Sequence, residues 1–127
     1  MKTTKKREPT ARTKNGVEPA EIWRARTFIR EHLSEKLSLT EIAKAVNISP
    51  TYLSEKFKEV TGENLVRYIA IARVEAAEAL LQSGDQRISE IAFAVGFQSL
   101  SQFNRVFKNL RGKTPTEFRQ EHRNPSG

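Results

Sequence analysis

Residues 39–46 read LTEIAKAV and residues 88–95 read ISEIAFAV, so two short stretches 49 positions apart share most of their pattern. In both stretches the apolar residues recur at the spacing of one face of an α-helix. Each stretch is followed by a residue that tolerates a left-handed backbone, Asn47 in the first copy and Gly96 in the second. A short helix that ends in a tight turn is therefore predicted twice.

A longer helix is predicted after each turn. Ser49 is a favourable N-cap and is followed by proline, which suits the first helical position. Ser99 matches Ser49 at an offset of 50, because one additional residue falls beside Gln98. Gly62 and Gly112 occupy the usual position of glycine after a helix. Short helix, tight turn and capped longer helix form the helix-turn-helix pattern, and two matched copies are hard to obtain by chance.

Three further helices complete the expected fold. One begins near Pro19 and ends near Leu33. Residues 64–82 contain no proline or glycine and are apolar on several sides, which predicts a long central helix. Thr114, followed by a proline and a glutamate, predicts a last helix that ends near His122. The expected fold class is all-α, with about seven helices in two helix-turn-helix subdomains joined by the central helix.

The basic residues are concentrated at the N-terminus. Residues 1–16 hold six basic residues and one acid (6 − 1 = +5), whereas residues 17–127 hold sixteen basic residues and fourteen acids (16 − 14 = +2). Such a tail can contact a polyanion or stay solvated, so the functional prediction depends on the folded part. The expected divisions are a flexible basic arm, a first helix-turn-helix subdomain, a linker helix, a second helix-turn-helix subdomain and a tail: 1–16, 17–63, 64–83, 84–123 and 124–127.

Several classes of function find no support in the composition. The chain has no cysteine, so disulfides and thiolate metal sites are excluded, and the isolated His32 and His122 complete no metal-ligand set. No stretch is long and apolar enough to span a membrane or to form a secretory signal. No phosphate-binding glycine loop or catalytic constellation is present. We therefore expect a cytoplasmic protein that is not an enzyme and has no cofactor, metal or membrane partner.

The chain resembles the DNA-binding domain of the AraC/XylS family of bacterial transcription regulators. The resemblance is carried by residues 39–62 (LTEIAKAVNISPTYLSEKFKEVTG), by Tyr68 and Arg73, and above all by residues 88–119 (ISEIAFAVGFQSLSQFNRVFKNLRGKTPTEFR). In the last segment I-x-x-I-A-x-x-x-G-F, S-x-F-x-R-x-F-K and G-x-x-P-x-x-F-R fall at the family's spacings. The match covers roughly residues 20–122.

The resemblance implies a fold and a set of partners. It implies seven helices, with two recognition helices in successive major-groove segments on one face of double-stranded DNA. It further implies that this domain binds as a monomer, often bends its site, and regulates promoters, here as an activator, by contacting RNA polymerase. Family members usually add a separate ligand-sensing or dimerisation domain.

Helical periodicity separates the two faces of each longer helix, and the residues it directs inward are Leu53, Phe57 and Val60 in the first and Phe103, Phe107 and Leu110 in the second. Base edges are read by outward side chains near the start of a recognition helix. Arginine suits guanine O6 and N7, and glutamine or asparagine suits adenine N6 and N7, so Arg105, Gln102 and Asn104 form a chemically competent set. The residues predicted to read bases are Thr51, Tyr52, Ser54, Glu55, Ser101, Gln102, Asn104 and Arg105.

Phosphate contacts are expected from helix starts, whose free N–H groups favour anions, and from neighbouring hydroxyl and lysine side chains. For any single serine or threonine, the alternative is simple helix capping, and we favour it. The predicted phosphate-binding residues are Thr40, Ser49, Lys58, Ser89, Ser99, Lys108, Lys113 and Thr114.

The two copies differ in charge. Residues 96–116 contain four basic residues and no acid, whereas the two lysines of residues 49–62 are balanced by two glutamates. Glu55 stands where the second copy has Arg105. Its carboxylate can accept from cytosine N4, or it can pair with a neighbouring lysine and read nothing; we favour the pairing. The second copy is therefore expected to supply more of the affinity for an asymmetric site.

Structural roles are expected for three other residues. Arg73 and Arg119 are expected to make structural pairs, and Trp23 to lie in the core or to pack between helices, because Ile22 and Ile29 beside it are core-like.

A helical protein-interaction or adaptor module is the alternative function. The salt dependence of binding discriminates between the two functions, because binding to a duplex weakens steeply with salt.

Overall fold

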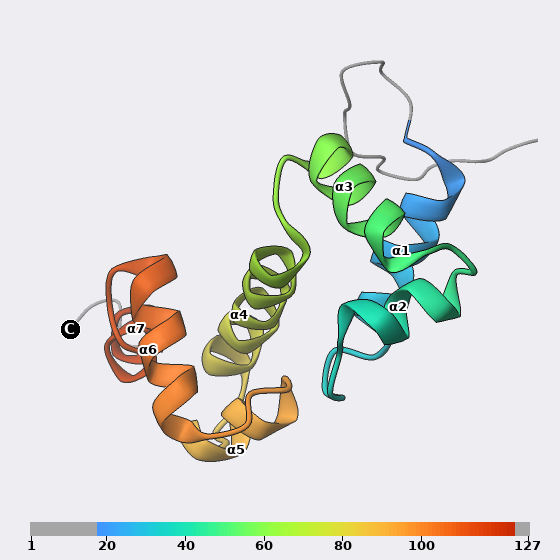
Figure 1. Cartoon of the computed structure of the whole chain (residues 1–127). Coiled ribbons are helices and arrows are strands. Elements are labelled where there is room, and N and C mark those ends of the chain that lie inside the picture. The colour runs from blue at the N-terminus through green and yellow to red at the C-terminus, as the bar shows by residue number, and fades with distance from the viewer. Residues whose placement is uncertain (1–17, 124–127) are drawn as a thin grey trace, which may run out of the picture. The chain divides into compact units, whose positions relative to one another are not determined.

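A computed structural model describes residues 18–123, and they form seven α-helices (Figure 1). The helices are α1 (Ala20–Glu31), α2 (Leu39–Ala45), α3 (Pro50–Thr61), α4 (Leu65–Ser83), α5 (Ile88–Ala94), α6 (Leu100–Arg111) and α7 (Pro115–Arg123). No strand occurs within these residues, so the predicted all-α fold class is confirmed. The expected basic arm and tail lie outside the described residues.

The described helices belong to two compact units. Unit 1 contains the described residues up to His32 together with Leu37–Tyr68, and so holds α1, α2, α3 and the first turn of α4. Unit 2 contains Leu33–Lys36 and the chain from Ile69 onward, and so holds the rest of α4 with α5, α6 and α7. The chain thus enters unit 2 for the short loop Leu33–Lys36, returns to unit 1 at Leu37, and passes to unit 2 again within α4.

Hydroxyl side chains cap four of the helices, and three of these caps, Ser49, Ser99 and Thr114, were predicted. Ser38, Ser49 and Ser99 each accept a hydrogen bond from the backbone N–H three residues further on, at 3.0–3.1 Å. At the start of α7 the hydrogen bonds are reciprocal: Glu117 N donates to Thr114 Oγ1 (3.1 Å), and Thr114 N donates to Glu117 Oε1 (2.8 Å). The free N–H groups of these helix starts are thereby partly satisfied, which fixes where α2, α3, α6 and α7 begin.

The two tight turns have the left-handed backbone that their residue types predict, with φ of 63° at Asn47 and 108° at Gly96. Gly96 meets a second constraint, because a Cβ atom there would lie 2.2 Å from the carbonyl oxygen of Leu33 and 2.6 Å from Nε of Arg73. Arg73 is held at this place by hydrogen bonds to the carbonyl oxygens of Leu33 (3.1 Å) and Glu35 (2.8 Å). Glycine is therefore required at position 96 for space as well as for φ.

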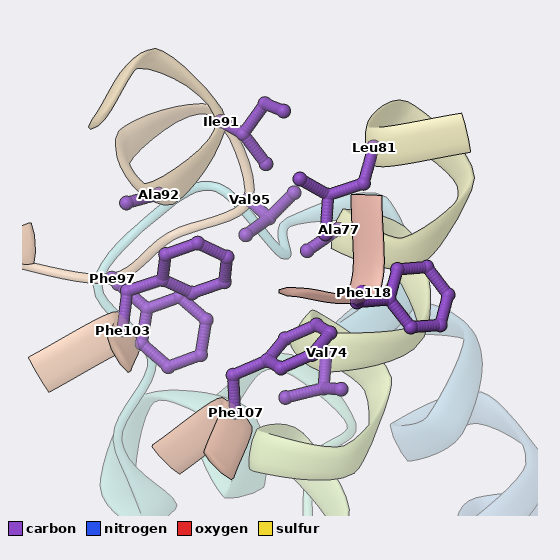
Figure 2. Packing of buried hydrophobic residues seen from close by; sticks show 10 residues of the cluster. All are labelled: Val74, Ala77, Leu81, Ile91, Ala92, Val95, Phe97, Phe103, Phe107 and Phe118. Atoms are coloured by element: carbon purple, nitrogen blue, oxygen red, sulfur yellow. The ribbon is translucent and has the colours of Figure 1, made fainter. Parts of the chain in front are cut away.

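The core of unit 2 is built around aromatic side chains (Figure 2). Phe103 and Phe107 of α6 are fully buried, and Phe107 makes edge-to-face contacts with Phe103 and with Phe118 of α7, with ring centroids 5.7 and 5.6 Å apart. Val74 and Leu81 of α4 pack into the same cluster. The inward face predicted for the second long helix is confirmed.

The core of unit 1 combines an apolar cluster with a polar network. Phe57 of α3 is fully buried and contacts the ring of Tyr68 edge to face, at 5.0 Å between centroids. The guanidinium of Arg26 donates to the hydroxyl of Tyr68 (3.2 Å) and to the buried carboxylate of Glu18 (2.8 Å). The predicted inward stripe of α3 is confirmed, whereas no sequence pattern revealed the network.

Of the two places expected for Trp23, the core is wrong, because the residue is 41% exposed, whereas packing against a neighbouring helix stays a prediction. Ile22, Ala25 and Ile29 form the buried stripe of α1, and Trp23 lies about 100° away from Ile22 around the helix. Because successive residues of a helix point in directions about 100° apart, the neighbour of a core residue in sequence need not share its buried face.

The structural roles expected for two arginines are confirmed, but their partners are backbone carbonyls rather than carboxylates. Besides the contacts of Arg73, the Arg119 guanidinium donates to the carbonyl oxygens of Gln86 (2.7 Å) and Leu81 (3.4 Å), the latter near the end of α4. Burial lowers the pKa of Arg73. Both arginines thus fix loop backbone within unit 2.

Candidate nucleic-acid interface

Helix α3 exposes the face opposite its buried stripe. Thr51, Glu55 and Lys58 are separated by four and three positions, so they share one face, and all three are exposed. We call these residues the outer triad of α3. Ser54 and Tyr52 are also exposed, one on each flank of the triad. The outward orientation predicted for these five residues is confirmed.

Helix α6 carries the matching face. Ser101, Arg105 and Lys108 have the same spacing and are all exposed, and we call them the outer triad of α6. Asn104 is exposed on one flank, and Gln102 is half-buried on the other. Each triad begins in the first turn of its helix, where side chains of a helix-turn-helix reach base edges.

Two of the four basic residues in the second copy are engaged inside unit 2. Arg111 Nε lies 2.6 Å from Glu78 Oε2, and this hydrogen bond raises the pKa of Arg111. Lys113 forms an ion pair with Glu121. Among the residues that the structure describes, Arg105 and Lys108 form no ion pair. The uncompensated positive charge of α6 is therefore concentrated in its outer triad.

The interpretation favoured for Glu55, a pair with a neighbouring lysine, is wrong. Lys56 pairs with Glu59 instead, at 3.7 Å between Nζ and Oε1. Within the described part of the chain no ion pair holds the Glu55 carboxylate. Lys56 lies about 100° around α3 from Glu55, which separates it from the outer triad. Glu55 is therefore an exposed acceptor at the centre of the outward face.

The hydroxyl of Tyr52 has a partner on another helix. It donates a hydrogen bond to Glu21 Oε2 of α1 at 2.7 Å. This hydrogen bond lowers the pKa of Glu21 and raises the pKa of Tyr52. Glu21 was not among the predicted site residues, because no periodicity or cap connects two residues 31 positions apart.

The side chain of Gln102 is partly committed to the turn before α6. Its Oε1 accepts a hydrogen bond from the backbone N–H of Gln98 at 2.9 Å. A bidentate contact with adenine requires this oxygen to accept from N6 while the amide nitrogen donates to N7. The predicted adenine contact would therefore cost the hydrogen bond to Gln98, whereas Arg105 and Asn104 have no side-chain hydrogen bond to lose within the described residues.

The predicted phosphate-binding residues fall into three groups. Ser49, Ser99 and Thr114 do cap helices, and any contact of theirs with phosphate stays a prediction. Thr40, Lys58 and Lys108 are exposed, whereas Ser89 and Lys113 are half-buried and Lys113 is paired. Lys58 and Lys108 are therefore the predicted phosphate ligands whose charge is available without breaking an ion pair.

The described residues offer neither a membrane-spanning helix nor a metal-binding cluster. None of their helices is both long enough and apolar enough to cross a membrane. Across the same residues, no group of three or more histidine, aspartate or glutamate side chains could hold a metal ion.

Two short helices, each followed by a tight turn and a longer helix with an exposed triad, define a tandem helix-turn-helix domain. A family model described as a helix-turn-helix domain matches residues 42–121. The chain belongs to the AraC-type helix-turn-helix family of DNA-binding domains.

Solved structures share the fold over most of the chain. The C-terminal domain of AraT, a response regulator from Geobacillus stearothermophilus, has a TM-score of 0.79 and 34% identity, covering 81% of this chain and 86% of that one. A transcriptional regulator from Chromobacterium violaceum with an AraC-type DNA-binding domain has a TM-score of 0.77 and 30% identity, covering 83% and 94%. The DNA-binding domain of AdpA, in complex with a target DNA, has a TM-score of 0.77 and 25% identity, covering 84% and 98%.

Curated relatives are longer proteins. The Msm operon regulatory protein of Streptococcus mutans is 32% identical over 110 residues, which are 87% of this chain and 40% of that protein. The MmsAB operon regulatory protein of Pseudomonas aeruginosa is 31% identical over 100 residues, 79% of this chain and 33% of that protein. The chain spans about a third to two fifths of the length of these relatives.

Proposed function

We propose that the chain binds double-stranded DNA at a specific sequence and belongs to a bacterial transcription regulator. Recognition helices α3 and α6 enter successive major-groove segments of one site. The observation that carries this proposal is the pair of outer triads, exposed at matching positions of two helix-turn-helix copies. The similarity to the AdpA domain, whose structure contains its target DNA, supports the same function. The chain acts by binding rather than by catalysis.

Base reading is assigned to the outer triads and to the residues beside them. Arg105 presents a guanidinium that can bind guanine O6 and N7, and Asn104 can bind adenine N6 and N7. Glu55, which has no lysine partner within the described residues, can accept from cytosine N4 or only repel phosphate. The remaining base-reading candidates are Thr51, Tyr52, Ser54, Ser101 and Gln102.

Phosphate binding is assigned to the helix starts and to the two exposed lysines. At the starts of α3, α6 and α7, the backbone N–H groups and the positive end of the helix dipole both favour a bound anion such as phosphate. Lys58 and Lys108 add charge, and Lys113 can do so when it leaves Glu121. The other contributors are Thr40, Ser49, Ser89, Ser99 and Thr114.

The site that such a domain reads is asymmetric, because its two outer triads differ in charge. One copy of the domain occupies one site, since it carries both recognition helices itself. In keeping with the family resemblance, the regulator activates promoters and contacts RNA polymerase.

Selection of bound sequences from random duplexes, followed by titration of the selected site at several salt concentrations, tests this function. We expect one asymmetric consensus and a log–log slope of about −0.9 per neutralised phosphate between about 50 and 200 mM salt. Equal binding to unrelated duplexes, or a flat salt response, would contradict the proposal and favour the adaptor function, which the neutral outer triad of α3 would also suit.

A further inference from the structure

Tyr52 lies in the first turn of α3, but its hydroxyl is held by a residue outside the helix-turn-helix. The phenol donates to Glu21 Oε2 of α1 at 2.7 Å. A hydrogen bond to an ionised acceptor is roughly twice as strong as one between neutral groups. Tyr52 is exposed and Glu21 is half-buried, so burial does not force the two groups to pair. The bond fixes an exposed tyrosine at the flank of the outer triad.

The edge of α3 that carries Tyr52 is directed toward α1. Tyr52, Lys56 and Glu59 follow at four and three positions, so they share this edge. Arg24 and Lys56 act on Glu21 electrostatically, and Glu59 acts on Tyr52. The Tyr52 hydrogen bond lowers the pKa of Glu21, and the Glu21 hydrogen bond raises the pKa of Tyr52. At neutral pH the carboxylate is therefore ionised and the phenol protonated, as the hydrogen bond requires.

The commitment of this one hydrogen changes what Tyr52 can recognise. A tyrosine hydroxyl has a single hydrogen to donate, but its oxygen can also accept. With the hydrogen directed to Glu21, Tyr52 can only accept a hydrogen bond or make an apolar contact through its ring. In the major groove the donors are adenine N6 and cytosine N4, and thymine offers a methyl group, whereas guanine offers only acceptors.

We propose that Glu21 is a positioning residue that sets the base preference of Tyr52, directing it toward adenine, cytosine or thymine and away from guanine and phosphate. This inference rests on the proposed function, because Tyr52 must reach the major groove. Glu21 itself touches no base. It acts through the phenolic hydrogen, and this part of the preference is therefore determined by α1.

A double-mutant cycle on the selected DNA site tests this role. The base pair that Tyr52 reads is the one at which Tyr52→Ala removes the preference. At that pair, affinities for the four bases are compared in the wild type, in Glu21→Ala, in Tyr52→Phe and in the double variant. Glu21→Ala should reduce the discrimination against guanine about fivefold, which corresponds to one hydrogen bond. In the Tyr52→Phe background the same substitution should change nothing at that pair.

Glu31→Ala is the matched control, because it removes an exposed carboxylate from the same helix. It should change the affinity for all sequences alike. The inference would be overturned if Glu21→Ala had the same effect as Glu31→Ala. It would also be overturned if Glu21→Ala raised the affinity for guanine in the Tyr52→Phe background. No effect of Tyr52→Ala at any base pair would also overturn it. A wild-type chain that selects no sequence would overturn the proposed function as well.

A measurement without DNA completes the test. The pKa of Tyr52, followed by NMR in the free protein, should fall toward its ordinary value in Glu21→Ala and stay unchanged in Glu31→Ala. An unaltered Tyr52 pKa in Glu21→Ala would show that the hydrogen bond is absent in solution and would overturn the inference.

Discussion

Helices α3 and α6 have the same length and the same caps, but they differ on their outward faces. The outer triad of α3 carries one acid and one base, whereas the outer triad of α6 carries two bases and no acid. Inside, the difference is small, because Leu53 and Phe57 correspond to Phe103 and Phe107, and all four are fully buried. Truncating a buried side chain costs about 2–5 kcal/mol, whereas most surface changes cost less than about 0.5 kcal/mol. The packing of the duplicated scaffold thus constrains its inner faces and leaves the outer ones free to diverge.

One flanking residue of each triad is restrained by a hydrogen bond, but by different means in the two copies. Tyr52 is held by Glu21 of a neighbouring helix, and its counterpart Gln102 is held by the backbone of the turn before its own helix. In unit 1 the restraint brings a negative charge to the edge of the face, and in unit 2 it brings none. The charge difference between the copies therefore extends beyond the triads.

The largest expected loss of stability comes from the second of the two turns, at Gly96. Gly96→Ala should lower the free energy of unfolding by about 3 kcal/mol or more, because the left-handed φ and the clash with Leu33 and Arg73 both act against it. Asn47→Ala in the first copy adds no atom and should cost only about 1 kcal/mol. Urea unfolding followed by circular dichroism measures both losses.

Gly112→Ala is the control for the clash, because Gly112 has a φ of 80° and open space where the Cβ would be. It should cost about 1 kcal/mol, the value of left-handed strain alone. Equal losses for Gly96→Ala and Gly112→Ala would mean that Arg73 and the loop at Leu33 move aside without cost.

Arg105→Ala should have the next largest effect. Loss of the guanidinium should weaken binding to the selected site by about 1–3 kcal/mol and relax the preference at one base pair. Competition binding with single-base variants of the site measures this. If all sequences lose affinity equally, Arg105 contacts phosphate, and the outer triad of α6 does not read bases through its arginine.

Two lysines of unit 2 should differ in the salt dependence that they contribute. Lys108→Gln should reduce the log–log slope by about 1, because Lys108 is exposed and has no ion pair within the described residues. Lys113→Gln should reduce it by less, because Lys113 already pairs with Glu121. Fluorescence anisotropy at increasing salt measures both slopes, and a larger change for Lys113→Gln would show that DNA displaces Glu121.

Glu55→Gln should have the smallest effect. Removing the carboxylate relieves repulsion of phosphate, so affinity should rise by less than about fivefold, which corresponds to roughly 1 kcal/mol. A loss of cytosine preference at one base pair would instead show that Glu55 accepts from cytosine N4. The same selection experiment distinguishes the two outcomes, and only the second makes the outer triad of α3 a reader through its acid.

Local chemistry made much of the fold predictable. A cap such as Ser99 and a left-handed residue such as Gly96 act within a few positions of the chain, so the sequence shows both partners of each interaction. The alternation of buried and exposed residues along α3 and α6 follows from 3.6 residues per turn. The outward faces were predicted for the same reason.

The contacts between distant residues could not be predicted in this way. Glu21 reaches Tyr52 across 31 positions, and Glu78 reaches Arg111 across 33. Which polar side chains pair with each other depends on how the helices pack, and periodicity along a single helix carries no such information. Trp23 was misplaced because apolar neighbours in sequence do not determine on which side of a helix a residue lies.

The close approach around Gly96 bears on how such a domain could be re-engineered. A chimera in which the first turn replaced the second would put an asparagine side chain where the Leu33 carbonyl and the Arg73 guanidinium already stand. The turns of the two helix-turn-helix copies therefore cannot be exchanged, although the helices around them still match. New target sequences are better sought by exchanging the six residues of the outer triads, which leaves each turn in the surroundings that it fits.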